Sequence, residues 1–490
     1  MIYQLNNIQP TQKLPTRQIV ICGAGVAGIV LALKLAQNRF GVTLIEGGDE
    51  FATQQSQEIY NGRNTAMKNE GIHACRLRFL GGTSNHWAGR CMRLQPIDFT
   101  DRKFFELPGW PIAPSELDKH FEEACDILDV STNEFNPPAF PGQFISNSLK
   151  TIGHADSPPT RLARKYHELL ANSRYIDVYL NANLTAIHLN DAGNRIKSIM
   201  VSDYNNHKHV LTGKQYVLAM GAIENARYLL NSNKQIPKGI GNHSDFVGRC
   251  FMEHLNVPLG RFITDYDKQL WNVKQFELFP TKDFALKQKI GTGVIAFHPN
   301  ANPPTYGHLA SMKRYIRNSI CTSTNLTELS RHLVDFNCPG DGIIDTLIEQ
   351  TPNRNSRITL DRETDRFGVH RICLNWEIND LDRRTIRKLA LEAAKELARN
   401  DLARVQLPSY ILEQDEDIPI GEHCHHMGTT RMASKRENGV VDTNCMVFGI
   451  GNLYIAGSSV FPTGGGVNPT FTIVQLTLRL AEHLSTKSFS

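Results

Sequence analysis

One glycine-rich turn near the start constrains the fold of this chain more than any other feature. The apolar run Ile19 to Cys22 predicts a buried strand, and the amphipathic residues that end at Asn38 predict a helix. Between them stand the residues of a dinucleotide-binding fingerprint, Gly23, Gly25, Val26, Ala27 and Gly28. The first glycine would make the turn, the second would let a pyrophosphate approach the backbone, and the third would let helix and strand pack closely.

A second apolar run strengthens this prediction. Val42 to Ile45 ends in Glu46, whose carboxylate can accept hydrogen bonds from the hydroxyls of a ribose. Strand, glycines, helix, strand and acid in this order favour a bound dinucleotide over a turn that serves packing alone. The fingerprint itself fits NAD as well as FAD. The similar run Gly291 to Ala296 is followed by Pro299, which would break the helix it needs, so a single site favours a resident FAD.

The sheet that begins at Ile19 is predicted to be assembled from distant parts of the chain. Apolar runs that stop at a glycine recur at Tyr216 to Met220 and at Leu453 to Ala456. Three short runs in the middle of the chain predict a small antiparallel meander: Leu184 to Leu189, Arg195 to Asp203 and Lys208 to Leu211. A helical pattern, Thr470 to Leu484, closes the chain.

The remaining residues predict a second domain, because 490 residues exceed what one hydrophobic core usually serves. They hold strand-like runs at Arg357 to Leu360 and Val369 to Trp376, and helical runs at Leu381 to Arg399 and at Ser115 to Leu128, which Ser115 could cap. We expect an α/β, Rossmann-like FAD-binding domain made of residues 1–105, 180–254 and 416–490. Residues 106–179 and 255–415 would form an α+β substrate-binding domain, an antiparallel sheet covered by helices.

Two polar residues near the end of the chain could carry chemistry. His425 opens His-His-Met-Gly-Thr-Thr, and Asn468 lies in Gly-Gly-Gly-Val-Asn-Pro-Thr. A neutral imidazole beside a carboxamide can hold the hydroxyl of an alcohol and take its proton. Three alternatives stay open: His426 could be the base, Asn468 could only cap the final helix, and His423 to His426 could bind a metal.

Charge and cysteine content argue against several classes of protein. The formal net charge of +4 is modest, and the densest basic groups, Arg161 to Lys165 and Lys313 to Arg317, are typical of solvated faces rather than of nucleic-acid binding. The ten cysteines show no CxxC pair and no regular spacing, which favours a reducing cytoplasm over a disulfide framework. The sequence has neither an apolar signal core nor a run of about 18 apolar residues, so we expect a cytoplasmic protein without a membrane span.

Several further motifs stand in an order that resembles one enzyme family. They are Gly81 to Gly89 (Gly-Gly-Thr-Ser-Asn-His-Trp-Ala-Gly), Leu218 to Glu224, Val247 to Arg249 and Ser356 to Ile358, besides the fingerprint and the two C-terminal motifs. Together they resemble the glucose-methanol-choline (GMC) family of FAD-dependent oxidoreductases. Within that family the pyranose oxidases and bacterial choline-dehydrogenase-like members are the most similar. The resemblance covers nearly the whole chain and is loosest in the substrate-binding domain.

The resemblance implies roles for individual residues. It implies that His425 is the catalytic base and Asn468 its partner, and it adds cofactor contacts at Gly81, Gly82, Thr83, Asn85, His86, Leu184, Ala222, Gly457, Asn468 and Thr470. His86 would either be joined covalently to the 8α-methyl group of the flavin or pack against the flavin without a bond. Thr430 departs from the pattern of the pyranose oxidases, which have a second histidine there. Neither their sugar specificity nor their tetramer is therefore implied.

These observations predict the FAD-dependent oxidation of a primary or secondary alcohol on a sugar, a glycoside or a small polar metabolite. His425 would take the hydroxyl proton, Asn468 would orient the hydroxyl, and the flavin would accept hydride. Oxygen, a quinone or a protein carrier would then take the electrons. Two other classes stay open: a flavin-dependent lyase or decarboxylase on the same fold, and a non-catalytic flavin-binding subunit.

Overall fold

Six parallel strands form the sheet that holds the glycine-rich turn. The structure is a computed structural model that describes residues 1–67, 69–136, 146–264, 276–299, 312, 319 and 340–487. The order of the strands across the sheet is β1 (Ile2–Gln4), β8 (Ile176–Leu180), β3 (Val42–Ile45), β2 (Ile19–Cys22), β12 (Gln215–Leu218) and β22 (Leu453–Ile455). The inner strands β2, β3 and β12 are buried along their whole length, as expected for a parallel sheet with both faces covered. The prediction of a sheet assembled from both ends and the middle of the chain is confirmed.

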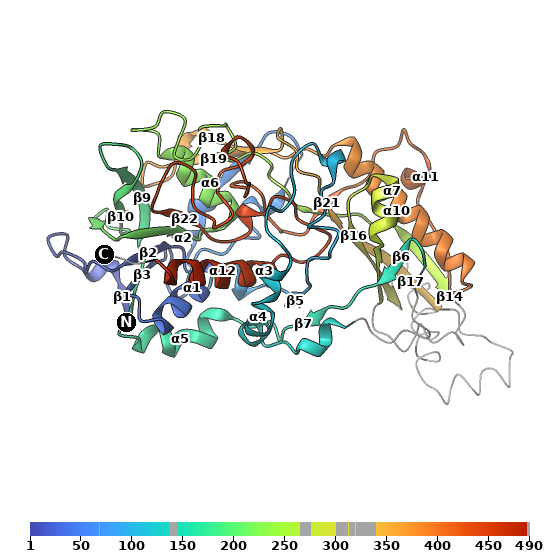
Figure 1. Ribbon diagram of the computed structural model, residues 1–490, viewed down its shortest axis with the longest axis horizontal. Coiled ribbons are helices and arrows are strands. Elements are labelled where there is room, and N and C mark those ends of the chain that lie inside the picture. Colours follow the sequence, from blue (N-terminus) through green and yellow to red (C-terminus); the bar gives the residue numbers. More distant parts are fainter. Residues whose placement is uncertain are drawn as a thin grey trace.

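Helices and the predicted meander surround this sheet. Helix α1 (Val26–Gln37) packs against α12 (Thr470–Ser485) and against α5 (Leu162–Asn172). The antiparallel meander is confirmed as β9 (Asn183–Leu189), β10 (Ile196–Ser202) and β11 (Lys208–Leu211). Both chain termini lie at this end of the molecule, and α12 extends from it beside α1 toward the middle (Figure 1).

An antiparallel sheet of eight strands forms the other end of the molecule (Figure 1). Its strands are β20 (Arg404–Gln406), β14 (Gly260–Thr264), β17 (Gly340–Glu349), β16 (Gly293–Pro299), β15 (Phe276–Pro280) and β6 (Leu149–Thr151), with β13 (His254–Asn256) and β21 (Gly421–Glu422) at the side. The long helix α10 (Asp380–Arg399) packs against it, and the short helices α7 (Lys282–Gln288) and α11 (Ser409–Leu412) lie nearby. Phe276 and Phe297 stack on adjacent strands with ring centroids 4.4 Å apart. This sheet and its helix fit the predicted α+β part of the fold.

Three strands lie in sheets other than the predicted ones. β18 (Arg357–Thr364) and β19 (His370–Asn375) join β4 (Gly62–Asn64) and pack against α6 (Gly221–Asn231), the helix that follows β12. Conversely, all of β8 except Leu180 comes from the range 106–179, and the strand pairs with β1 and β3 in the parallel sheet. Local alternation predicts a strand but not its partner. The domain limits drawn from the sequence stay a prediction.

The helix predicted from Ser115 to Leu128 is two helices, α3 (Ser115–Asp118) and α4 (Phe121–Leu128). The prediction that Ser115 caps it is wrong, because Pro114 occupies the N-cap position and no side chain caps the helix there. Proline fits the start of a helix since its fixed φ is already helical. One further short helix is α2 (Gln54–Gln57). Two short strands, β5 (Arg90–Cys91) and β7 (Ala155–Asp156), pair with each other.

Two features of the sequence lie outside the described residues, namely the basic group Lys313 to Arg317 and the cysteines Cys321 and Cys338. Among the helices that the structure does describe, none combines the length and the apolar character needed to cross a membrane.

Candidate active site

The glycine-rich turn has the geometry that its sequence predicts. Gly23 adopts a φ of +103°, and a Cβ atom added there would lie 2.6 Å from the carbonyl oxygen of Ala219. A Cβ atom on Gly28 would lie 1.8 Å from the carbonyl oxygen of Gly23. Side chains are excluded at both positions, so the turn-forming role of Gly23 and the packing role of Gly28 are confirmed.

A cavity of about 620 Å³ opens at the carboxyl ends of three neighbouring parallel strands. Gly25 follows β2, Gly221 follows β12 and Gly457 follows β22, and all three line it. A Cβ atom added to any of them would meet nothing within 4 Å. Bare backbone therefore faces open space along this edge, where open α/β sheets bind their ligands.

Most of the predicted cofactor contacts line this cavity: Gly23, Gly25, Val26, Ala27, Glu46, Gly82, Thr83, His86, Leu184, Ala222, Gly457, Asn468 and Thr470. Gly28, Gly81 and Asn85 do not line it. Gly28 is enclosed by the turn, and the side-chain amide of Asn85 donates to the carbonyl oxygen of Leu80 (2.9 Å). Gly28 and Asn85 therefore support the turn and the loop that line the cavity, without lining it themselves.

Glu46 stands at the end of β3 with its carboxylate against the glycine-rich turn. One oxygen accepts the backbone N–H of Ala24 (3.0 Å) and the other accepts that of Gly48 (2.9 Å). A carboxylate oxygen can accept a further hydrogen bond. Glu46 is therefore held at the cavity wall, where its carboxylate can accept hydrogen bonds from the hydroxyl groups of a ligand.

His425 lies on a bulge between two paired segments. The pairs Leu255–Glu422 and Met252–Met427 enclose two residues on one side and four, including His425, on the other. Extra residues on one strand bend it and redirect its side chains. The bulge carries His425 to the wall of the cavity, which His423 and His426 also line.

Glu253 and His254 are the two residues on the short side, and they hold His425 from two directions. The backbone N–H of His425 donates to Oε2 of Glu253 (2.7 Å), and Nδ1 of its ring lies 2.9 Å from Nδ1 of His254. The other carboxyl oxygen of Glu253 lies 3.2 Å from Nε2 of His426. Glu253 and His254 are both completely buried. No sequence pattern drew attention to either of them.

Burial keeps this cluster uncharged at neutral pH. It lowers the pKa of His425 well below its usual range, and the neighbouring His254, His423 and His426 lower it further. It lowers the pKa of His254 to about 4 and that of His426 to about 3. Burial also raises the pKa of Glu253 to about 8. His425 is therefore a neutral imidazole, the form that can accept a proton.

Asn468 lines the same cavity as His425. Its side-chain oxygen is buried and has no hydrogen-bond partner among the described residues. The alternative that Asn468 only caps the final helix is wrong, since Pro469 holds the N-cap position of α12 and no side chain caps it. A buried amide oxygen without a partner is costly unless a ligand satisfies it.

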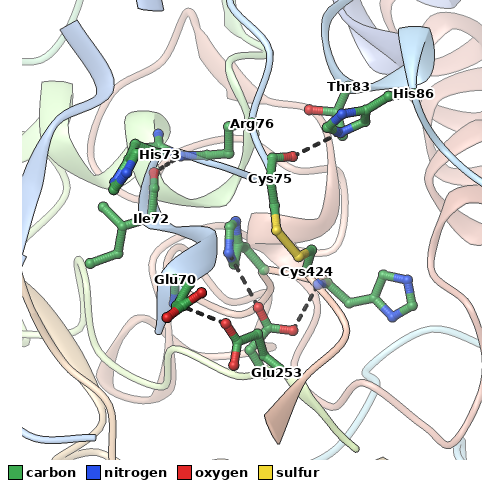
Figure 2. The surroundings of a disulfide bond; sticks show 12 residues. Glu70, Ile72, His73, Cys75, Arg76, Thr83, His86, Glu253 and Cys424 are labelled. Carbon is green, nitrogen blue, oxygen red and sulfur yellow. Dashed lines mark hydrogen bonds and ion pairs between the residues drawn. A yellow bond between two sulfur atoms is a disulfide. The ribbon is translucent and has the colours of Figure 1, made fainter. Parts of the chain in front are cut away.

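A disulfide bond crosses the cavity wall between Cys75 and Cys424 (Figure 2), which are 349 positions apart in the sequence. The carbonyl oxygen of Cys75 lies 3.1 Å from Nε2 of His86 on one side. On the other side, Cys424 directly precedes His425. The cysteine pattern did not predict this bond. Cys424 is consequently not a thiolate ligand, which removes it from the proposed metal site.

The candidate site falls inside a segment shared with known enzymes. Residues 352–477, which include His425 and Asn468, match the family described as GMC oxidoreductase. This segment belongs to the GMC oxidoreductase family. The family predicted from the sequence motifs is thereby confirmed.

The whole chain, and not only this segment, is similar to several known proteins. It is 22% identical to the fructose dehydrogenase large subunit of Gluconobacter japonicus, over 95% of this chain and 97% of that protein. It is 22% identical to pyranose 2-oxidase of Lyophyllum shimeji, over 91% of this chain and 78% of that protein. The structure of pyridoxine 4-oxidase from Mesorbium loti has the same fold, with a TM-score of 0.61, 18% identity, and coverage of 96% and 100% of the two chains.

The cavity fits FAD, the cofactor that the sequence predicts. The bare backbones of Gly25, Gly221 and Gly457 leave room for a flat and elongated ligand along the strand ends. Glu46 lies at the turn that would hold the pyrophosphate, and Asn468, whose side-chain oxygen has no hydrogen-bond partner among the described residues, lines the same cavity. The donor set and the shape therefore agree with the cofactor that the sequence predicts.

Proposed function

We propose that this protein oxidises a primary or secondary alcohol to a carbonyl compound, with His425 as general base and Asn468 orienting the hydroxyl group. The observation that supports this most strongly is that both side chains line the cavity of the glycine-rich turn. One is a neutral imidazole, which can accept the hydroxyl hydrogen, and the other is a carboxamide, whose N–H can donate to the hydroxyl oxygen. Together they match what an alcohol needs for loss of its proton.

The chemistry divides between the side chains and the cofactor. His425 accepts the hydroxyl proton at a ring nitrogen, which leaves negative charge on the alcohol oxygen and makes the carbinol C–H bond a better hydride donor. The carboxamide of Asn468 fixes the oxygen so that this C–H bond has one orientation in the cavity. Bound FAD supplies the two-electron acceptor for the hydride.

The names of the relatives support a substrate class. Two relatives are named for fructose and for a pyranose, and the structural neighbour is named for pyridoxine. All three compounds are small and polar and carry alcohol groups. We propose a sugar, a glycoside or a small polar metabolite as the substrate, with oxygen, a quinone or a protein carrier as the final electron acceptor.

His86 is proposed to pack against the flavin without a covalent bond. Its Nε2 lies 3.1 Å from the carbonyl oxygen of Cys75 and donates to it, so a flavin joined at Nε2 would have to break this hydrogen bond. Acid precipitation of the loaded protein tests this proposal. Yellow colour released into the supernatant is the expected result. Colour that stays in the wild-type pellet and leaves the pellet of His86→Ala would contradict it.

Anaerobic mixing of the FAD-loaded protein with a panel of sugars, glycosides and small alcohols tests the proposed reaction. Loss of the flavin's visible absorbance together with the formation of a carbonyl product is expected with at least one of them. A product that forms while the flavin stays oxidised would indicate a lyase or decarboxylase and contradict the proposal. If no compound in the panel reduces the flavin or is converted to a product, the result would favour a non-catalytic flavin-binding subunit and would also contradict the proposed reaction.

A further inference from the structure

His254 joins the two C-terminal motifs through the two nitrogens of one ring. Its Nδ1 lies 2.9 Å from Nδ1 of His425, and its Nε2 lies 2.6 Å from the carbonyl oxygen of Gly465. Gly465 stands three positions before Asn468. A single buried side chain thus contacts the proposed base and the segment that carries its proposed partner.

The carbonyl oxygen of Gly465 determines which atom donates in each of these two hydrogen bonds. A carbonyl oxygen can only accept, so Nε2 of His254 carries a hydrogen and donates it to Gly465. A neutral imidazole has one N–H, and burial keeps His254 neutral by lowering its pKa to about 4. Nδ1 of His254 is then an acceptor. Its neighbour, Nδ1 of His425, must be the donor in the 2.9 Å contact.

The chain therefore determines which nitrogen of His425 is free. We propose that His254 is a positioning residue that holds His425 in the tautomer protonated at Nδ1, leaving Nε2 as the nitrogen that takes the substrate proton. This inference rests on the proposed function for the role of His425. The tautomer of a histidine is set by the hydrogen bond that its other nitrogen makes, and here that bond runs to a second histidine.

The carbonyl group that fixes His254 is itself held in place. The backbone N–H of Gly465 donates to Oε1 of Glu349 (3.2 Å), and Glu349 is buried in a double hydrogen bond with Arg102 (2.6 and 2.7 Å). Gly465 has a φ of +61°, and a Cβ atom added there would lie 2.8 Å from a side-chain atom of Leu94. The residue has little freedom to turn its carbonyl group away from His254.

Glu253 contributes to the same arrangement from the opposite side. Its Oε2 accepts the backbone N–H of His425 (2.7 Å), which fixes the main chain while His254 fixes the ring. Consecutive residues of an extended segment point to opposite sides. One short stretch of chain thereby clamps both the backbone and the ring of His425.

Nitrogen NMR on the FAD-loaded protein with ¹⁵N-labelled histidine tests the inference directly. The His425 signals are identified as those lost in His425→Gln. We expect Nδ1 to resonate as a protonated nitrogen and Nε2 as an unprotonated one in the wild type. A proton on Nε2 of His425 would overturn the inference. The wild-type spectrum alone gives this result, so the test does not depend on the folding of a His254 variant.

Two substitutions at His254 provide a matched comparison. His254→Leu removes the acceptor and should let His425 populate both tautomers, so its two nitrogen signals move toward a common average. His254→Asn places a carboxamide oxygen close to the position of Nδ1 and should restore the wild-type signals. Signals in His254→Leu that match the wild type, in a variant whose circular dichroism spectrum is unchanged, would also overturn the inference.

Flavin reduction separates this inference from the proposed function. We expect the anaerobic reduction rate to fall at least about twofold in His254→Leu, because half or more of His425 would present the wrong nitrogen or orientation. His254→Asn should recover most of the rate. If His425 has the expected tautomer but no alcohol reduces the flavin, the proposed function fails while the tautomer assignment stands. If alcohols reduce the flavin through His425 but the tautomer of His425 is the same in His254→Leu as in the wild type, only the present inference fails.

Discussion

The backbone N–H of His425 donates to Oε2 of Glu253, 2.7 Å away and completely buried. This contact ties the bulge that carries His425 to the strand opposite it. Because burial raises the pKa of Glu253 to about 8, the acid is uncharged at neutral pH and is held by hydrogen bonds rather than by an ion pair. The site thus places a buried, protonated carboxyl group directly beneath the proposed base.

The stability of the protein should depend on pH through Glu253. Its carboxyl group has a pKa of about 8 in the folded chain and an ordinary value of 4.5, so between these values the folded state binds the extra proton. The contribution of Glu253 to stability should therefore fall as pH rises from 4.5 to 8, by up to a few kcal/mol at about 1.4 kcal/mol per pKa unit. His254 and His426, whose pKa values are lowered in the folded chain, act in the opposite direction below pH 6.5, so the fall should show in the measured stability above that pH. Glu253→Gln should flatten this part of the profile in thermal unfolding, whereas Glu437→Gln, at an exposed position, should leave it unchanged. Identical profiles for wild type and Glu253→Gln would contradict the account.

Replacing Asn468 should affect catalysis more than stability. Its buried oxygen has no partner among the described residues, so Asn468→Leu breaks no hydrogen bond there and should not lower the melting temperature of the cofactor-free protein. The rate of flavin reduction by the alcohol should fall about tenfold to a hundredfold, since one hydrogen bond to the hydroxyl is lost.

Asn452→Leu is the matched control for this substitution. The Asn452 amide is buried and pairs with both the N–H (2.7 Å) and the C=O (2.9 Å) of Ile196. Leucine at this position should destabilise the protein by about 1–3 kcal/mol because these backbone groups lose their partners. Equal losses of stability in the two variants would show that Asn468 serves the fold.

The disulfide between Cys75 and Cys424 should stabilise the wall of the cavity. Breaking it frees a very long loop of the unfolded chain, and removal of a native disulfide typically costs about 2–4 kcal/mol. Cys75→Ser should lower the melting temperature, and a thiol reductant should lower that of the wild type to a similar degree. The reductant should have no further effect on Cys75→Ser. If the reductant leaves the melting temperature of the wild type unchanged, the result would contradict the assignment of this bond.

Much of the nucleotide-binding half could be predicted because its signals are local. Three glycines, an apolar run and an acid lie within about thirty residues, and each has one structural role that a short stretch of sequence specifies. Gly23 and Gly28 have the predicted geometry, and the strands at Tyr216 and Leu453 lie in the predicted sheet. Runs of this kind are recognisable since both faces of such a sheet are covered.

The support of the candidate base could not be predicted, because it comes from distant segments. His254 and His425 are 171 positions apart, and Cys75 and Cys424 are 349 apart. No periodicity or spacing links such pairs, and a buried glutamate or histidine has no pattern of its own in a sequence. The partners of strand β8 were missed for the same reason, since alternation marks a strand without naming its neighbour.

Single-turnover reduction of the flavin in His425→Gln tests the central claim most directly. Wild type and variant, both loaded with FAD, would be mixed without oxygen with an alcohol that reduces the wild type, and the flavin absorbance followed over time. We expect equal flavin content but a rate lowered about 10²- to 10⁴-fold in the variant, because glutamine cannot accept the hydroxyl proton. A rate within a few-fold of the wild type, at equal flavin content, would contradict the assignment of His425 as the base.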